Sequence, residues 1–342
     1  MTPDQGSLIN VDRCLVPQTA IGSECLRVGL AREVRVEPVP RPCFPGGIKY
    51  AAFYNAHIAD KQQVHLQPIA ASRSSGVLIP GAGPLLPVGS TQDYTIPRTA
   101  SSGPDVRVRV FTPPGARPAS GWPGCVYFHG GGWVLGTIDT ENVVCSNLCA
   151  RGGAVVVTVD YRLAPEDPFP AAVDDCWEAV RWVVARGPEL LGLDLGRLAT
   201  GGSSAGGNLA ALLSVPVADN TATAETTPSW RENEQTPALP APKMLWYRRH
   251  YLPRESDWAH PEASPLLWDG DWSRLPRAVI VCGELDVLRD EGVAFGDRLN
   301  KAGVRADVHV LEGQPHPFLA MDGVLEDGRR AITYFCEALK EL

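Results

Sequence analysis

The stretch Gly202-Ser203-Ser204-Ala205-Gly206 fits the pattern Gly-x-Ser-x-Gly, between an apolar run at 197–200 and a helix-forming run at 208–213. The glycines allow a sharp strand-to-helix turn, because a Cβ at either position would collide with the neighbouring strand or helix. Such a turn lifts a serine hydroxyl out of the backbone, where it can act as a nucleophile. Alone, the pattern also suits an ordinary glycine-rich turn, so its meaning depends on the rest of the chain.

A second glycine motif lies upstream, His129-Gly130-Gly131-Gly132-Trp133, directly after an apolar run at 125–128 that predicts a buried strand. Three consecutive glycines cost backbone entropy, which favours a specific role over a flexible loop. Bare N–H groups can bind the oxygen that becomes negative during acyl transfer, each contributing on the order of 3 kcal/mol in the transition state. We predict an oxyanion hole made by the N–H groups of Gly131, Gly132 and Ala205. His129, at a strand end, is interpreted as a residue that holds the loop.

An acid and a base follow the serine along the chain. The run 278–283 predicts a buried strand, and Asp286 comes just past its carboxyl end, where an orienting carboxylate belongs. The run 306–311 alternates like a strand, and His316 follows it in a loop as the candidate base. The order Ser204, Asp286, His316 is the order of the triad in α/β-hydrolases.

Other acidic and histidine side chains lack this context. Asp290 and Glu291 suit the start of the next helix, because acidic side chains interact favourably with the N-terminal end of the helix dipole. His309 lies inside the predicted strand and suits a core or surface position. The remaining histidines have no comparable surroundings; they are His57, His65, His250 and His260.

These motifs together resemble the hormone-sensitive-lipase-like family of α/β-hydrolase esterases. Two further segments match that family, Asp160-Tyr161-Arg162-Leu163-Ala164-Pro165-Glu166 and Asp286-Val287-Leu288-Arg289-Asp290-Glu291. The resemblance runs from Tyr94 to the C-terminus and more loosely back to Tyr50. It implies an α/β fold with a mostly parallel central sheet flanked by helices, and supporting roles beside the glycine loop for Asp160 and Arg162.

The resemblance also implies an activity. Members of the family hydrolyse carboxylic esters, usually with short acyl chains, and need no cofactor or metal. The chain is therefore expected to be a serine ester hydrolase that forms an acyl-enzyme on a small-molecule ester. Two alternatives stay open: an amidase or arylformamidase using the same triad, and a non-catalytic ligand-binding member, as in the gibberellin receptors of plants.

Three departures from the family pattern stand out. Ser203 replaces an acidic residue, which changes hydrogen bonding beside the nucleophile, and Pro317 replaces a common glycine, which stiffens the loop after the histidine. The third is a short crossover: only about nine helical residues separate Ala205 from 215–220, which resembles the end of the family's next strand, whereas a crossover takes at least about 10–12 residues. A true variant, an alternative splice form or an incorrect gene model would each explain it. The central sheet is expected to be affected close to the nucleophile.

The chain divides into five predicted segments. Residues 1–45 end in clustered prolines and are predicted to be a poorly ordered extension. Residues 46–90 are predicted to form an N-terminal cap segment, with a helix at 48–68 and a loop at 72–90. The α/β-hydrolase core comprises two further segments. A cap insertion separates them and lies between the nucleophile and the acid in the sequence. These three are, in order, 91–218 (core), 219–272 (cap insertion) and 273–342 (core).

Strand and helix patterns alternate within the core. Residues 92–97 and 105–112, the latter with strict Val-Arg-Val-Arg-Val alternation, predict an antiparallel pair with one solvated face. Strands and helices then alternate, which predicts a parallel sheet wound by right-handed crossovers. The predicted elements are a strand at 125–129, a helix at 140–151, a strand at 154–160, a helix at 171–186 and a strand at 198–202.

The predicted cap insertion is rich in tryptophan. It carries Trp230, Trp246, Trp258, Trp268 and Trp272, five of the nine tryptophans of the chain, and the basic pair Arg248-Arg249. Aromatic side chains in a cap over the carboxyl edge of the sheet would line acyl and alcohol pockets. The equally weighted alternative is that they only fix an irregular insertion to the core.

Composition excludes several other classes. Hydrophobic residues make up 44% of the 342 residues, enough for a large core, and the net charge is −8 without any basic run, which argues against nucleic acid as a partner. No stretch approaches the roughly 18 apolar residues of a membrane span, and the first ten residues lack a signal-peptide pattern, so a cytoplasmic location is expected. The nine cysteines show no metal-binding spacing, although Cys145 and Cys149 are one helical turn apart, and reduced, mostly buried thiols are expected. The oligomeric state stays open, with a homodimer as one option.

Overall fold

The structure is a computed structural model that describes residues 48–74, 80–214 and 227–342. The predicted extension at 1–45 lies outside the described residues. So does the segment 215–220, which was expected to resemble the end of a family strand.

The first five strands form one sheet in the order β1-β2-β4-β3-β5. Strands β1 and β2 pair antiparallel, as the sequence predicts, and β2 also runs antiparallel to β4, whereas β3 is parallel to both β4 and β5. The valines of β2 are buried and its arginines face outward, which accounts for the strict alternation. The strand bounds are Ser90–Ile96 for β1, Val106–Thr112 for β2, Trp122–Phe128 for β3, Val155–Asp160 for β4 and Leu193–Gly202 for β5.

The remaining two strands pair separately. Strands β6 (Ala278–Leu285) and β7 (Ala306–Pro315) form a two-stranded parallel sheet. Among the described strands, none pairs with both β5 and β6, so the mostly parallel sheet divides at the point where the crossover is short. Helix α5 (Ala205–Ser214) is the last described element before this division, and the crossover after it lies outside the described residues.

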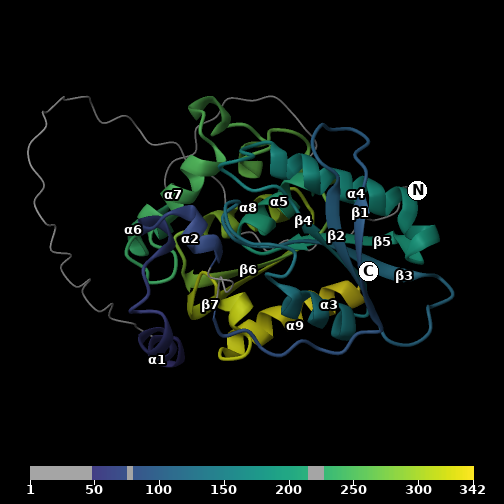
Figure 1. The fold of residues 1–342 in the computed structure, drawn as a ribbon, viewed down its shortest axis with the longest axis horizontal. Helices are drawn as coiled ribbons and strands as arrows, with labels where there is room; N and C mark the ends of the chain where they lie inside the picture. The colour runs from purple at the N-terminus through teal and green to yellow at the C-terminus, as the bar shows by residue number, and fades with distance from the viewer. Residues whose placement is uncertain (1–47, 75–79, 215–226) are drawn as a thin grey trace, which may run out of the picture.

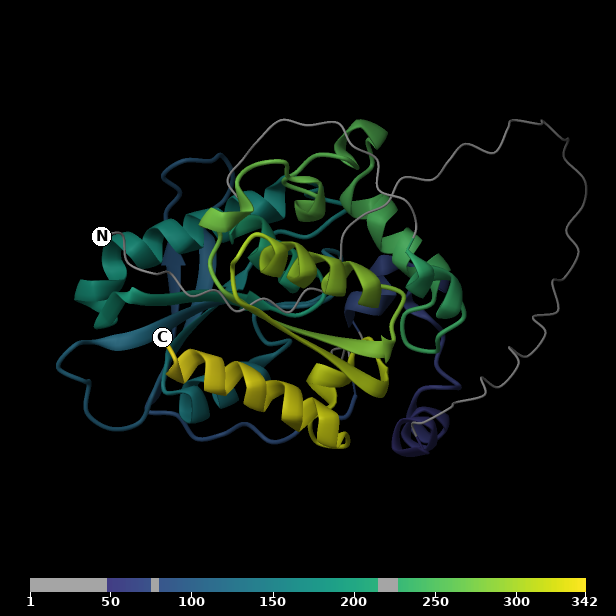
Figure 2. The ribbon, with the colours of Figure 1, turned by 180° about the vertical axis from the view of Figure 1, so that it is seen from behind.

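Helices cover both faces of these sheets. Figures 1 and 2 show α3 and α9 on one side, and α4, α5 and α8 on the other. One core cluster joins α3 and α9 to side chains of β3, β4 and β6, so it connects the two sheets by packing. The helix bounds are Asn142–Gly152 for α3, Ala171–Leu190 for α4, Arg289–Lys301 for α8 and Glu326–Lys340 for α9.

Two segments far apart in the chain meet at one end of the molecule. The early helix α2 lies beside the later helices α6 and α7 in both views, whereas α1 lies apart from them at the same end (Figures 1 and 2). Arg73 fixes α2 to the core by donating to the carbonyls of Val134 (3.0 Å) and Ala164 (2.8 Å). The bounds are Ile48–His57 for α1, Ile69–Ser74 for α2, Pro228–Glu232 for α6 and Ala241–Tyr251 for α7, with 3-10 turns at Val64–Leu66, Glu255–Asp257, Pro265–Leu267, Trp272–Arg274 and Phe318–Met321.

Some element bounds differ from the sequence prediction. The helix expected at 48–68 ends at His57, because the N–H groups of Ile58 and Ala59 both bond to the carbonyl of Tyr54 and close the helix. The loop expected at 72–90 starts later, since α2 continues to Ser74. Strand β5 also begins earlier than 198, at Leu193.

The tryptophans of the predicted cap insertion fix it to the core. None of the five, all of which lie in the described residues, lines the pocket beside Ser204. The indole of Trp230 donates to Glu291 of α8 at 3.0 Å, and that of Trp258 donates to the carbonyl of Leu252. Trp272 packs edge-on against Phe295 of α8. The hypothesis that these indoles line the pocket is therefore wrong, and the alternative of structural anchoring is right.

The six cysteines in the described ranges are buried, in line with the expectation of buried thiols: Cys125, Cys145, Cys149, Cys176, Cys282 and Cys336. No helix in the described ranges has the length and apolar character needed to cross a bilayer.

The close contact of β3 with α5 gives a stability prediction. A Cβ added at Gly206 would lie 1.9 Å from the carbonyl oxygen of Phe128. Because both partners are backbone, Gly206→Ala is expected to lower the free energy of unfolding by about 3 kcal/mol or more. Urea denaturation followed by circular dichroism measures this.

Gly196→Ala is the matched control, since that exposed strand glycine has only the Asp194 side chain nearby. Equal stability of the two variants would contradict the proposed contact.

Candidate active site

The three predicted catalytic side chains lie at carboxyl ends of strands. Ser204 occupies the turn between β5 and α5, Asp286 directly follows β6, and His316 directly follows β7. The register of the parallel pair β6–β7 aligns Leu285 with Pro315, so the next residue on each strand, the acid and the histidine, come out side by side. The acid and the histidine, which are separate in the sequence, therefore lie close together in space.

The turn at Ser204 is strained. This residue has a φ of +53°, a left-handed conformation that is rare for residues other than glycine. A Cβ at Gly202 would lie 2.4 Å from backbone atoms of Gly206, and one at Gly206 would meet the Phe128 carbonyl. Both glycines are therefore required for the turn, for the reason given by the sequence.

The three side chains form one hydrogen-bonded chain. Ser204 Oγ lies 2.7 Å from His316 Nε2, and His316 Nδ1 lies 2.7 Å from Asp286 Oδ2. Asp286 is fully buried, and its other oxygen accepts the N–H of Leu288 at 2.9 Å. A hydroxyl, an imidazole and a buried carboxylate in this sequence can transfer a proton away from the hydroxyl.

The glycine loop lies next to this chain because of strand register. Phe128 of β3 pairs with Gly202 of β5, so the loop after β3 and the turn after β5 emerge together. Gly131 and Gly132 have φ values of +128° and +63°. Among the described residues, no hydrogen bond takes up the N–H groups of Gly131, Gly132 or Ala205. The three donors predicted from the sequence therefore line the pocket with free N–H groups.

Tyr247 of α7 closes over this loop. A Cβ at Gly132 would lie 2.3 Å from its ring, so the absence of a side chain at this position is a packing requirement as well as a conformational one. The Tyr247 ring thereby limits the space above the N–H groups of the loop.

The three residues predicted to support the loop differ in how close they lie to it. His129 is buried, stacks on Tyr161 at 4.2 Å between ring centroids, and contacts the carbonyl of Gly130 through Nδ1 at 2.8 Å. Burial lowers the pKa of His129, which keeps it neutral at pH 7 and unsuited to receive the serine proton.

Asp160 and Arg162 contact residues further from the glycines of the loop. Asp160 Oδ1 accepts the N–H of Ile138 at 2.9 Å, at the far end of the same loop. Arg162 forms a salt bridge with the buried Asp175 of α4 at 2.9 Å and donates to the carbonyl of Ala171. These two side chains fix the surroundings of the loop and do not line the pocket.

Sequence reasoning missed Glu141. This buried carboxylate accepts the hydroxyl of Ser203 in a short hydrogen bond, the hydroxyl of Tyr127 at 2.9 Å and the N–H of Gly130 at 3.3 Å. Burial is the main effect on its pKa, which is raised. Glu141 precedes α3, so its position in the sequence signals only a helix start. The one available hint was Ser203, a serine where relatives carry an acid and whose hydroxyl needs a buried partner.

A second missed group ties α6 and the residues after it to the acid loop. Asn233 Nδ2 donates to the carbonyl of Asp286 at 3.1 Å, and Thr236 Oγ1 donates to that of Leu285 at 2.8 Å. Ser229 donates through Oγ to the carbonyl of Val287 at 2.8 Å. These short polar side chains have no recognisable sequence pattern, although together they fix the backbone that carries the acid.

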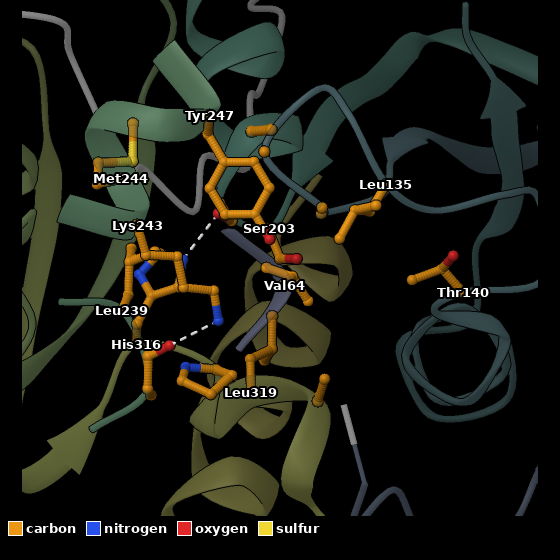
Figure 3. A pocket seen from close by; sticks show the side chains of 18 of the residues that line it. Val64, Leu135, Thr140, Ser203, Leu239, Lys243, Met244, Tyr247, His316 and Leu319 are labelled. Carbon is orange, nitrogen blue, oxygen red and sulfur yellow. Dashed lines mark hydrogen bonds between the residues drawn. The ribbon is translucent and has the colours of Figure 1, made fainter. Parts of the chain in front are cut away.

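A cavity of about 180 Å³ opens beside Ser204. Its walls are mostly apolar, and Figure 3 shows Val64, Leu135, Leu239, Met244, Tyr247 and Leu319 around His316. Such an enclosure suits a small organic ligand with a few polar contact points. In the described ranges, no group of three or more His, Cys, Asp or Glu side chains is arranged to hold a metal ion.

Comparisons with known proteins identify the family of this chain. Residues 125–320 match the alpha/beta hydrolase fold family. An AB hydrolase superfamily protein of Schizosaccharomyces pombe is 47% identical over 305 residues, covering 82% of this chain and 89% of that protein. An ethyl acetate hydrolase of Pseudomonas putida is 33% identical over 261 residues, covering 71% of this chain and 80% of that protein.

Solved structures agree. An esterase of Pyrobaculum calidifontis superimposes with a TM-score of 0.72 at 35% identity, over 82% of this chain and 95% of that one. The family match, the sequence identity and the shared fold all indicate the same family. The chain belongs to the alpha/beta hydrolase fold family that contains the hormone-sensitive-lipase-like esterases, and it is a carboxylic ester hydrolase.

Proposed function

We propose that this hydrolase cleaves small, short-acyl esters with Ser204 as nucleophile, His316 as base and Asp286 as the orienting acid. The observation that carries the proposal is the hydrogen-bonded chain through the two nitrogens of His316, each 2.7 Å from its partner oxygen. A histidine bonded in this way to a hydroxyl and to a buried carboxylate can accept the hydroxyl proton and be stabilised as imidazolium.

The reaction proceeds in two halves. As Ser204 Oγ attacks the ester carbonyl carbon, His316 Nε2 takes its proton, and the imidazolium then gives that proton to the leaving alcohol oxygen. The acyl group is now bonded to Ser204. A water molecule attacks the acyl carbon and gives a proton to His316, which returns it to Ser204 Oγ as the carboxylic acid leaves. Asp286 holds the imidazole in one tautomer throughout.

Negative charge develops on the carbonyl oxygen in both halves. The proposed donors to it are the N–H groups of Gly131, Gly132 and Ala205, which line the cavity with no other acceptor among the described residues. Because they are part of the backbone and fixed before the substrate arrives, they stabilise the oxyanion without reorganisation.

The cavity supports a preference for small esters. A volume of about 180 Å³ accommodates a short acyl chain and a small alcohol. The relative from Pseudomonas putida bears the name ethyl acetate hydrolase, which fits a small ester. The cap formed by 46–90 and 219–272, the cytoplasmic location and the homodimer stay predictions from the sequence.

Glu141 is proposed as a positioning residue. Its carboxylate joins Gly130, at the start of the glycine loop, to Ser203, the residue before the nucleophile. The donors for the oxyanion and the attacking oxygen are thereby held at a fixed separation, which matters because small displacements of reacting groups reduce rate strongly.

The nucleophile is tested by Ser204→Ala. Hydrolysis of p-nitrophenyl butyrate is expected to fall by about 10⁴-fold or more in kcat, because the substitution removes the hydroxyl that lies 2.7 Å from His316 Nε2. Stopped or continuous absorbance assays of the purified protein measure this. Labelling by a fluorophosphonate probe should disappear in the same variant.

Ser203→Ala is the matched control, and it should retain at least about a tenth of the activity. Retained hydrolysis in Ser204→Ala would reject the proposed nucleophile.

The reaction class is tested with a matched ester and amide. p-Nitrophenyl butyrate is expected to be cleaved about 10³-fold faster in kcat/KM than N-(4-nitrophenyl)butyramide, since the anilide nitrogen is a poorer leaving group and must be protonated as it departs. Comparable rates on the two compounds would favour the amidase alternative.

The role of Glu141 is tested by Glu141→Ala. The substitution leaves three buried donors without their acceptor, and kcat is expected to fall by about tenfold, equivalent to about 1.4 kcal/mol, while KM for a short ester changes little. Steady-state kinetics separate kcat from KM.

Glu141→Gln keeps an acceptor oxygen and is expected to recover part of kcat. An unchanged kcat in both variants would remove Glu141 from the proposal.

A further inference from the structure

One cation lies among the residues that line the catalytic cavity. Lys243 of α7 is the one lysine or arginine among the described residues of the lining, and Figure 3 shows its side chain reaching into the cavity from the helix. The surrounding side chains include Leu239, Met244 and Leu319, all apolar. Lys243 is half-buried, and a charged amine in a mostly apolar lining is a candidate for binding a ligand of opposite charge.

The hydrogen bonding of Lys243 is incomplete. Its Nζ donates to the carbonyl of Ala238 at 2.9 Å, which uses one of three N–H donors. No carboxylate of the described residues pairs with it, and burial alone lowers its pKa to about 8. Lys243 is half-buried, and below that pH its amine carries a positive charge that is paired with no carboxylate among the described residues.

Tyr50, Tyr247 and His316 also line this space. Two further titratable groups bear on the charge of the amine, His65 beside it and Glu141 in the lining. His65 lies close enough for Lys243 to help lower its pKa, after the larger effect of burial, so that imidazole stays neutral at pH 7. Glu141 is the carboxylate of the lining, and its oxygens already accept three hydrogen bonds beneath the glycine loop. Neither group neutralises the amine.

A structural role does not account for the charge. The bond to the Ala238 carbonyl would be made equally well by a neutral amide donor, which avoids the cost of desolvating an ammonium group. The amine also has no place in the proposed proton transfers, because His316 already bonds to the nucleophile. A ligand that brings a negative charge would compensate the amine and use its remaining donors.

We propose that Lys243 is a specificity residue that binds a carboxylate carried by the ester substrate, so that the preferred substrates are anionic esters, such as the monoester of a dicarboxylic acid. This inference rests on the proposed function of the Ser204 site. Charge-assisted hydrogen bonds from an ammonium to a carboxylate are short and strong where water is excluded. The net charge of −8 offers no long-range attraction for such a substrate, so recognition falls to this local contact.

The test compares esters that differ only in charge. Monoethyl adipate and its neutral isostere ethyl 5-carbamoylpentanoate place the charge on the acyl side, and 4-acetoxybutyrate and 4-acetoxybutanamide place it on the alcohol side. Hydrolysis is followed by pH-stat titration. The wild-type protein is expected to favour the anion at least tenfold in kcat/KM in one of the two pairs, which also identifies the side that Lys243 contacts.

Lys243→Met removes the charge at similar size, and the preference for the anion is expected to disappear while kcat/KM for the neutral ester stays within about threefold. Arg249→Met is the matched control, because it removes a positive charge from the exposed side of the same helix and should leave the preference intact. Lys243→Arg should retain part of the preference.

The outcomes separate the two proposals. Suppose that Ser204→Ala loses all hydrolysis while the wild-type protein hydrolyses anionic and neutral esters equally well. This result would overturn the role of Lys243 and leave the proposed function unchanged. An equal fall on both esters in Lys243→Met would do the same. Calorimetric titration of the Ser204→Ala variant with monoethyl adipate and with 4-acetoxybutyrate tests anion binding without turnover. If binding of both is unchanged by adding Lys243→Met, the proposal is rejected.

Discussion

The site depends on a contact between backbones, where the carbonyl of Phe128 at the end of β3 meets α5 at Gly206. No side chain fits between them. The helix can therefore begin directly over the strand, and the residue before it is forced into the strained left-handed conformation seen at Ser204. The same contact holds the end of β3 against the turn, so the glycine loop and the nucleophile have a fixed separation. One steric constraint thus sets both the attacking oxygen and the N–H groups opposite it.

The acid and the base depend on a different constraint. Their positions follow from the register of β6 and β7, which form a sheet of their own among the described strands. Alignment with the nucleophile comes from side-chain packing, through the core that α3 and α9 share with both sheets. Hydrogen bonds from Ser229, Asn233 and Thr236 to the acid loop add to it. The proposed catalytic side chains thus come from two separately built halves.

The sequence predicts most of what is local and periodic. The glycine motifs have one steric explanation, so Ser204 and the loop after Phe128 could be located without a structure, and the strand patterns located Asp286 and His316 by the rule that functional side chains follow carboxyl ends. Contacts between residues that lie far apart in the sequence could not be predicted from it. Glu141 reaches Ser203 across 62 residues, and only the fold brings them together. The tryptophans show a related limit. The aromatic content of the predicted cap insertion did not reveal whether the indoles face the pocket or the core.

The division of the strands into two sheets has a consequence for how heat affects this enzyme. Within a continuous ladder, hydrogen bonds hold neighbouring strands in register, whereas the two described sheets are joined by close-packed apolar side chains, so a change in that packing can shift one sheet against the other. A proton transfer over 2.7 Å between Ser204 and His316 is sensitive to such a shift. Loosening of this packing on heating would therefore misplace Ser204 relative to His316 even where both sheets keep their strands.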